Sequence, residues 1–230
     1  MEGLKQTTDE ESARLKNEAA SLYHELIQKP EIAEALTLLD GLPEHLRYHD
    51  KAHTLDVITE TILFALADGA SREVTEQQAI SAAWHDVGYI EQDKENEPIA
   101  IHLFEQSAAY KTLPDSERKE VIANILDTAL VMKGEIPYLL QQQSKFGYAL
   151  DGDVSNFGRN DFFEKRMKVA EEMGLDLTNP DIKKKFYKFT LDLLKNHEWK
   201  TASARMLRQL KKEENIRGAE EEYTRISNVI

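Results

Sequence analysis

The sequence predicts an all-α protein. Apolar residues recur at helical spacing along most of its 230 residues. No run of alternating β-branched residues indicates a strand, and the chain contains no internal repeat. No linker rich in Ser, Gly or Pro divides the chain, so we expect residues 1–230 to form a single domain. A domain of this length can bury a core without covalent cross-links.

Capping and turn residues predict where the N-terminal helices begin and end. The first helix begins at Thr8 or Asp9, with acidic residues in its first turn, and the second follows Pro30 and stops near Gly41. A third helix is expected over 50–69. Its C-terminal half is almost wholly apolar, which predicts that this helix is buried.

Similar signals continue along the rest of the chain. The next predicted helix opens at Thr75 and ends at Gly88, and its small residues would let another helix approach closely. A further helix begins at Asn96 with Pro98 in its first turn, where proline is tolerated. The segment 134–137, which contains Gly and Pro, indicates a loop. Amphipathic patterns predict further helices over 114–132, 161–173, 181–197 and 201–227.

The composition excludes several classes of partner. With 42 acidic and 29 basic side chains the net charge is −13, which repels a nucleic-acid backbone or an anionic membrane. Residues 1–20 are acidic and polar, and no apolar run approaches the roughly 18 to 20 residues of a membrane span. We therefore expect a cytoplasmic protein whose partners include no nucleic-acid polymer and no membrane. Cysteine is absent, so any metal site must use histidine and carboxylate ligands.

The stretch RYHDKAHTLDV places His49 and His53 one helical turn apart. One interpretation is a zinc-protease helix, because two histidines with an acid between them approach the HExxH pattern. Asp50 in place of the glutamate shortens the base, however, and no downstream helix supplies a third ligand in the expected context. Asp50 is more simply interpreted as a helix N-cap.

Two later stretches carry further candidate ligands. WHDVGY places His85 next to Asp86 at the end of a predicted helix, where a negative charge is unfavourable unless a cation lies nearby. ALDGDVSNFG places Asp151 and Asp153 in a glycine-marked break between helices. Long intervals separate the three stretches, so a site that uses all of them must be assembled from separate helices, as in the metal sites of helical bundles.

In this order, the three stretches resemble the motifs of the HD-domain superfamily of metal-dependent phosphohydrolases. They look most like those of bacterial members described only as predicted HD phosphohydrolases. The resemblance covers residues 47–158 and implies an HD-domain helical bundle with N- and C-terminal helical extensions. The core would span about 41–160, and the C-terminal extension about 161–230. The ligands that the resemblance implies are His53, His85, Asp86 and Asp153.

The resemblance also implies a chemistry. Two imidazoles and two carboxylates suit one divalent ion, which could be Mn²⁺, Fe²⁺, Mg²⁺, Ni²⁺ or Zn²⁺. Only His102 lies between the His-Asp doublet and the last ligand, so the set for a second ion is incomplete. The ion would activate water for attack on phosphorus. We expect Asp86 and Glu97 to be catalytic. The candidates for binding the substrate are His49, Lys94 and Arg159.

These inferences predict a metal-dependent phosphohydrolase that acts on a small phosphorylated molecule, with a nucleotide or a related phosphoester as the expected substrate. The alternative is a non-catalytic HD-fold protein that senses nucleotides or binds other proteins, although the complete ligand set argues against a degenerate site. The apolar stripes of the C-terminal helices could also serve a homodimer.

Overall fold

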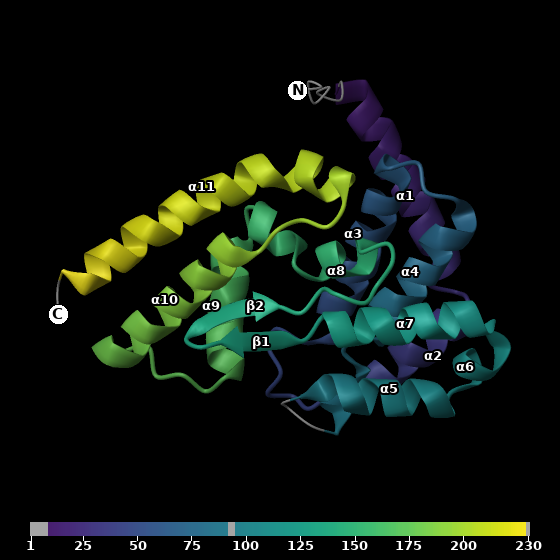
Figure 1. Cartoon of the computed structure of the whole chain (residues 1–230), viewed down its shortest axis with the longest axis horizontal. Helices are drawn as coiled ribbons and strands as arrows, with labels where there is room; N and C mark the ends of the chain where they lie inside the picture. The colour runs from purple at the N-terminus through teal and green to yellow at the C-terminus, as the bar shows by residue number, and fades with distance from the viewer. Residues whose placement is uncertain (1–8, 92–94, 229–230) are drawn as a thin grey trace.

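The computed structural model describes residues 9–91 and 95–228 and confirms the all-α prediction (Figure 1). Three short 3₁₀ helices join the longer elements: η1 (Leu39–Gly41), η2 (Val87–Ile90) and η3 (Ser155–Gly158). None of the described helices is both long and apolar enough to cross a membrane. The α-helices of the described residues are α1 (Asp9–Leu26), α2 (Pro30–Leu38), α3 (Lys51–Ala67), α4 (Arg72–Trp84), α5 (Asn96–Gln106), α6 (Ala108–Thr112), α7 (Asp115–Asp127), α8 (Tyr148–Asp153), α9 (Phe162–Glu172), α10 (Pro180–Asn196) and α11 (Ala202–Ser227).

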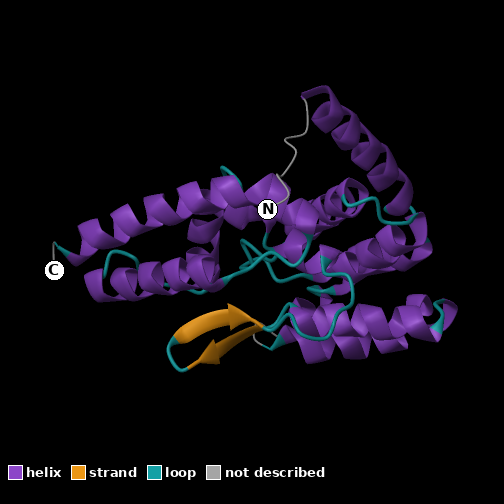
Figure 2. Cartoon of the chain, turned by 45° about the horizontal axis from the view of Figure 1, so that its top comes forward, coloured by secondary structure: helices purple, strands orange, loops and turns teal. Residues whose placement is uncertain are grey.

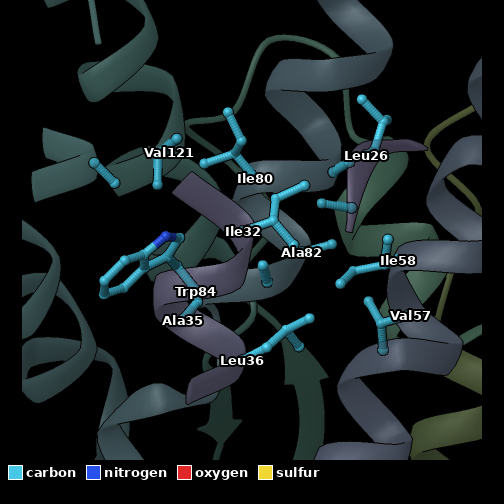
Figure 3. Packing of buried hydrophobic residues seen from close by; sticks show 14 of the residues in the cluster. Leu26, Ile32, Ala35, Leu36, Val57, Ile58, Ile80, Ala82, Trp84 and Val121 are labelled. Carbon is cyan, nitrogen blue, oxygen red and sulfur yellow. The ribbon is translucent and has the colours of Figure 1, made fainter. Parts of the chain in front are cut away.

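Helix α3 is the central element of the fold. Most of its residues are buried, as the apolar run in the sequence predicts, and α1, α4 and α8 all pack against it. Small residues of α4 allow this close packing, because Ala79, Ala82 and Ala83 are all fully buried. The main core gathers side chains from α1, α2, α3 and α4 (Figure 3). Its large members include Leu26, Ile32, Ile58, Ile80 and Trp84.

The C-terminal helices α9, α10 and α11 extend to one side of this core (Figures 1 and 2). A second apolar cluster joins Phe64 of α3 to residues of the C-terminal third, among them Phe157, Phe162, Leu194 and Trp199. Asn215 of α11 also donates hydrogen bonds to the carbonyls of Phe157 and Arg159, at 2.9 and 2.8 Å. Apolar packing and buried hydrogen bonds therefore both attach the C-terminal helices to the core.

One hairpin departs from the sequence prediction. The helix expected over 114–132 ends at Asp127, and strands β1 (Leu130–Lys133) and β2 (Ile136–Leu139) follow it as an antiparallel pair (Figure 2). Lys133 pairs with Ile136, so the turn has two residues, and Gly134 at its first position has φ 67°. A positive φ there is typical of the type II′ turn, which glycine adopts without steric cost. The predicted loop at 134–137 is therefore the two-residue turn of a hairpin followed by the first two residues of β2.

Smaller differences concern where helices start. Helix α4 begins at Arg72 rather than at Thr75, because the Ser71 side chain accepts a hydrogen bond from the backbone N–H of Val74 at 3.3 Å. The short helices α6 and α8 were not predicted. Helices of five or six residues are too short to show a clear amphipathic period. As a result, Asp151 and Asp153 lie in a helix and not in a break between helices.

Candidate metal centre

His53 lies in the first turn of α3, and the start of that helix positions it. Asp50 is the N-cap, as predicted, and its side chain accepts a hydrogen bond from the backbone N–H of His53 at 2.8 Å. The His53 side chain is buried, and the ring of Tyr48 packs against it with 4.7 Å between ring centroids. The His53 Nε2 atom lies 3.1 Å from Asp153 Oδ1.

His85 and Asp86 lie where α4 ends. His85 is the C-cap residue, and its Nδ1 atom is 2.7 Å from the carbonyl oxygen of Ala82. Since a carbonyl can only accept, Nδ1–H donates to it, and the lone pair of the neutral imidazole is then on Nε2. Histidines that bind metals usually make such a bond through the other ring nitrogen. Asp86 follows directly and is also buried.

Asp153 is the last residue of α8, and a glycine brings this helix close to α3. A Cβ atom on Gly152 would lie 2.5 Å from the Oγ1 atom of Thr61 and 3.0 Å from the carbonyl oxygen of Val57. Real Cβ atoms essentially never lie as close as the first of these distances, so only glycine permits this approach without a shift of α3 or α8. The glycine in the Asp-Gly-Asp stretch therefore helps to bring Asp153 near the ligands of α3.

These three elements bring His53, His85 and Asp153 together, and Asp86, which is not a member of that group, lies beside the two histidines. His53, His85 and Asp153 form a group whose ligand atoms lie within 4.8 Å of one another and which could hold a metal ion. Asp86 Oδ2 lies 3.0 Å from His85 Nε2 and 3.5 Å from His53 Nε2. Asp153 Oδ1 is 3.6 Å from His85 Nε2. His85 Nε2 and Asp86 Oδ2 are both buried and have no hydrogen-bond partner.

The spacing of these atoms fits a divalent transition-metal ion or Mg²⁺. Bonds of about 2.1 Å place neighbouring ligands about 3.0 Å apart around an octahedral ion and about 3.4 Å apart around a tetrahedral one. The four measured separations range from 3.0 to 3.6 Å. Two buried atoms without partners would also be satisfied by an ion. The donor set of nitrogen and oxygen atoms does not select one metal.

The charges within the cluster stabilise one another. Burial lowers the pKa of His85, but the carboxylates of Asp86 and Asp153 outweigh burial and raise it well above its ordinary value. Burial raises the pKa of Asp153, yet the neighbouring imidazoles of His53 and His85 outweigh burial and hold this pKa well below its usual range. The pKa of Asp86 is lowered as well. Both carboxylates are therefore ionised at neutral pH, which is the form that binds a cation.

Asp86 and Asp153 also line a cavity of about 380 Å³. This volume is within the range of sites for small molecules. The cavity wall includes residues of α5, the β-hairpin, α9 and α10 as well as these two aspartates, whereas His53 and His85 are not among its lining residues. His49 and Glu97, predicted from the sequence as substrate-binding and catalytic residues, line the same cavity. A small molecule bound there would contact the residues of the cluster.

Glu97 is in the first turn of α5, and Gly88 determines how close this turn comes to the cluster. A Cβ atom on Gly88 would lie 2.0 Å from the carbonyl oxygen of Asn96, so η2 and α5 pack with their backbones in contact. Burial raises the pKa of Glu97, and the charge of Asp86 raises it further. A carboxyl group with a raised pKa is suited to exchange protons near neutral pH.

His49 is held by a residue that the sequence did not reveal. The Glu172 carboxylate at the end of α9 accepts hydrogen bonds from the backbone N–H groups of Tyr48 and His49, at 2.9 and 3.0 Å, and it pairs with His49 Nδ1. The His49 ring also stacks on Tyr89 with 4.4 Å between centroids. Glu172 and Tyr89 therefore fix the orientation of the imidazole in the cavity wall.

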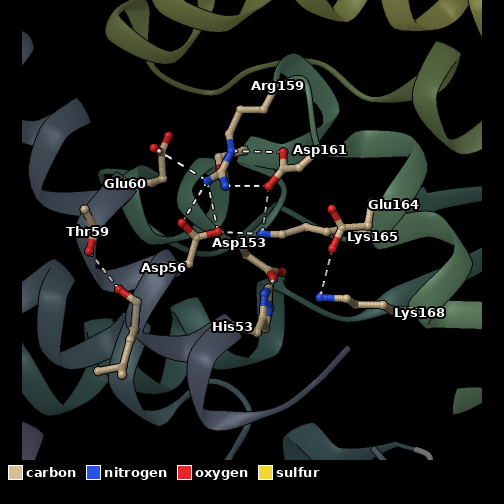
Figure 4. A network of polar contacts seen from close by, with 12 residues as sticks. His53, Asp56, Thr59, Glu60, Asp153, Arg159, Asp161, Glu164, Lys165 and Lys168 are labelled. Carbon is tan, nitrogen blue, oxygen red and sulfur yellow. Dashed lines mark hydrogen bonds and ion pairs between the residues drawn. The ribbon is translucent and has the colours of Figure 1, made fainter. Parts of the chain in front are cut away.

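Arg159 lies outside this cavity. Its guanidinium donates to both carboxylate oxygens of Asp56, at 2.8 and 2.9 Å, and pairs with Asp161 at 2.6 Å (Figure 4). Lys165 joins the same network through Asp56. Arg159 contributes instead to a smaller depression of about 280 Å³, which His53 also lines. The structure thus does not bring Arg159 together with His49 and Glu97, and Lys94 lies outside the described residues.

Asp151 is fully buried but has no place in the cluster. Its carboxylate accepts hydrogen bonds from the backbone N–H groups of Lys200 and Thr201, at 3.0 and 2.8 Å, and from the Thr201 hydroxyl at 2.7 Å. Thr201 is in turn the N-cap of α11. Of the two aspartates in α8, one therefore faces the candidate metal site and the other holds the start of α11.

No protein-family model, no curated protein and no solved structure matches the chain. The chemistry of the site has to be inferred from its own residues.

Proposed function

We propose that the protein is a metal-dependent phosphohydrolase of the HD type that acts on a small phosphorylated molecule, with a nucleotide or a related phosphoester as the favoured substrate. One observation carries the proposal. Two histidines and two aspartates from three separate stretches of the sequence lie together, largely buried, and both aspartates line a cavity of small-molecule size. A core packed only for stability has no need of such a group, because burying charged side chains is costly.

One divalent ion, held by His53, His85, Asp86 and Asp153, would supply the Lewis acidity that activates water and polarises a phosphoryl oxygen. The other functions fall to side chains of the cavity wall. Glu97, which lines the cavity, would accept a proton from the attacking water, and Asp86 would help to orient that water. His49 would donate a hydrogen bond to the phosphoryl group, with Glu172 fixing the orientation of its ring.

Metal analysis is the first test of this proposal. The purified protein is expected to retain close to one divalent ion per chain, and the double variant His85→Ala, Asp86→Ala is expected to retain none. His102→Ala is a matched control, because His102 is an exposed histidine outside the cluster and its loss should leave the metal content unchanged. If the wild type and the double variant hold equal amounts of metal, the cluster is not the metal site.

Turnover separates the enzyme from its main alternative. A panel of nucleotides and other phosphoesters with added Mn²⁺ should yield inorganic phosphate or a phosphomonoester with the wild type and not with Glu97→Gln. Binding of a nucleotide without any turnover would instead favour a non-catalytic sensing protein. The panel also determines whether the cavity accepts monoesters, diesters or both.

A further inference from the structure

The cavity beside the cluster has an apolar part that the metal chemistry does not use. The hairpin, α9 and α10 contribute side chains such as Leu130, Leu139, Val169 and Phe189 to its wall. Apolar walls of this kind favour a ligand with an apolar body. A phosphate bound at the cluster would leave the rest of the molecule in contact with these residues.

Arg166 of α9 is the cation among the cavity-lining residues, and much of its hydrogen-bonding capacity is unused. The residue is 5 % exposed. Its Nη2 atom donates to the Glu222 carboxylate at 2.6 Å, but Nε and Nη1 are buried without any partner. The guanidinium lies over the ring of Tyr187, 4.1 Å from the centroid. Leaving buried donors of a charged group unpaired is costly, and a ligand in the cavity could remove that cost.

Two other ion-paired arginines, Arg159 and Arg208, are partly buried and have a hydrogen-bond partner at every guanidinium nitrogen. Arg208 donates three hydrogen bonds to the Glu60 carboxylate, at 2.6 to 3.1 Å. Arg159 binds Asp56 and Asp161. Among the described residues, Arg166 is the arginine whose buried nitrogens lack partners. The unused donors thus lie on the arginine that borders the cavity.

We propose that Arg166 binds a second oxyanion of the substrate. The substrate would then be a phosphoester with an apolar body that also carries a carboxylate or a second phosphoryl group. The phosphoester part of this inference rests on the proposed function, whereas the oxyanion site at Arg166 does not. Because Nε and Nη1 are buried, the guanidinium must turn toward the cavity when the anion binds, with Glu222 still holding its other edge.

Binding of inert substrate analogues to the metal-loaded protein tests the proposal. The probes are ω-carboxyalkylphosphonates of increasing chain length, each beside the alkylphosphonate of the same length, with α,ω-bisphosphonates as a second series. At the length that spans the cavity, the second anion should strengthen binding roughly 10- to 100-fold, the effect of a charge-assisted hydrogen bond. Comparison of the two series shows which oxyanion is preferred.

Variants assign that gain to one side chain. Arg166→Met and Arg166→Lys should lose most of it while binding the plain alkylphosphonates as the wild type does. Glu222→Gln, which keeps the arginine, should retain the gain. Arg208→Lys is a matched control, since Arg208 is a partly buried, ion-paired arginine outside the cavity. No gain at any length, or a gain that survives in Arg166→Lys, would overturn the proposal.

Metal-free protein separates this proposal from the proposed function. Without the ion, an alkyl carboxylate should still shift the NMR resonance of the Arg166 Nε–H group, whereas an alkyl alcohol of equal length should not. If no phosphonate binds to the metal-loaded protein but the carboxylate shifts this resonance, the hydrolase proposal fails and the oxyanion site stands. An Arg166 resonance that responds to neither compound rejects the site, whatever the metal content.

Discussion

Replacement of Gly88 by alanine tests how the structure positions Glu97. The added Cβ would lie 2.0 Å from the carbonyl oxygen of Asn96 and 2.9 Å from the backbone nitrogen of Ala100. Ordinary contacts begin at 3.4 Å, so the first turn of α5 has to move by about 1.4 Å. Both atoms belong to a helix backbone, and a side-chain rotation cannot relieve the clash.

The expected cost is about 3 kcal/mol of unfolding free energy, the upper part of the usual range for overpacking. For a domain of this size that cost lowers the melting temperature by about 6 to 12 °C. Hydrolysis should fall as well, because the shift moves Glu97, whereas metal content should change little. Chemical and thermal denaturation measure the first effect, and metal analysis with a turnover assay measures the second.

Gly41→Ala is the matched control. A Cβ atom at Gly41 would meet only a methyl group of Ile90, at 4.0 Å, so this substitution should change stability by less than about 0.5 kcal/mol. If Gly88→Ala proves as stable and as active as Gly41→Ala, then η2 and α5 do not pack as described. The account of how Glu97 is positioned would then be wrong.

Three further predictions concern the C-terminal helices. Burial and the ammonium group of Lys212 lower the pKa of His197 from 6.5 to about 3. Between these two pH values the imidazole is protonated in the unfolded chain and neutral in the folded chain. Stability should therefore fall as the pH drops from 6.5 to 3, by up to about 1.4 kcal/mol per unit, and the slope should be shallower in His197→Gln denaturation curves. Asp151→Ala should cost about 3 kcal/mol in denaturant melts, because three donors, the two of Thr201 buried and that of Lys200 partly so, lose their acceptor; a loss below 1 kcal/mol would contradict that role. Glu172→Gln should lower kcat roughly tenfold and leave metal content unchanged, since it weakens the hold on His49 alone; an unchanged kcat would show that this contact is not used.

Much of the candidate site could be predicted because its residues conflict with their surroundings. Asp86 follows an apolar helix at the end where a negative charge is disfavoured, and Asp153 follows the apolar stretch that ends in Leu150. Such conflicts are visible in one sequence. The structure brings these aspartates together with His53 and His85, as the long spacing between the motifs implied.

Other parts of the site left no local signal. Glu172 contacts His49 across more than a hundred residues and is one of 42 acidic residues in a highly charged chain. Arg166 is similar, because its unpaired donors depend on which side chains surround it. For Arg159 the sequence instead suggested a role that the structure does not support. Its closeness to a motif suggested substrate binding, but its guanidinium already pairs with Asp56 and Asp161. Partners of charged side chains are set by tertiary packing, which a single sequence does not display.

The sequence did not predict the shortest helices and strands of the fold. The helical pattern of α7 continues in sequence into Val131 and Met132, yet these residues form β1, because a two-residue turn at Gly134 lets the chain pair with itself. Four-residue strands and a six-residue helix contain too few residues for a period to be recognised. The long helices α3, α10 and α11 were predicted well for the opposite reason.

The two aspartates of α8 connect the chemistry of the protein to its mechanics. Residues two apart in a helix point in nearly opposite directions. In this single turn, Asp153 therefore contacts the candidate ligand His53, while Asp151 accepts a hydrogen bond from Thr201 at the start of α11. A displacement of α11 would be passed to the ligand through only two peptide units. Removal of residues 201–228 would therefore disturb the candidate metal site, and the C-terminal helices cannot be treated as a detachable appendage.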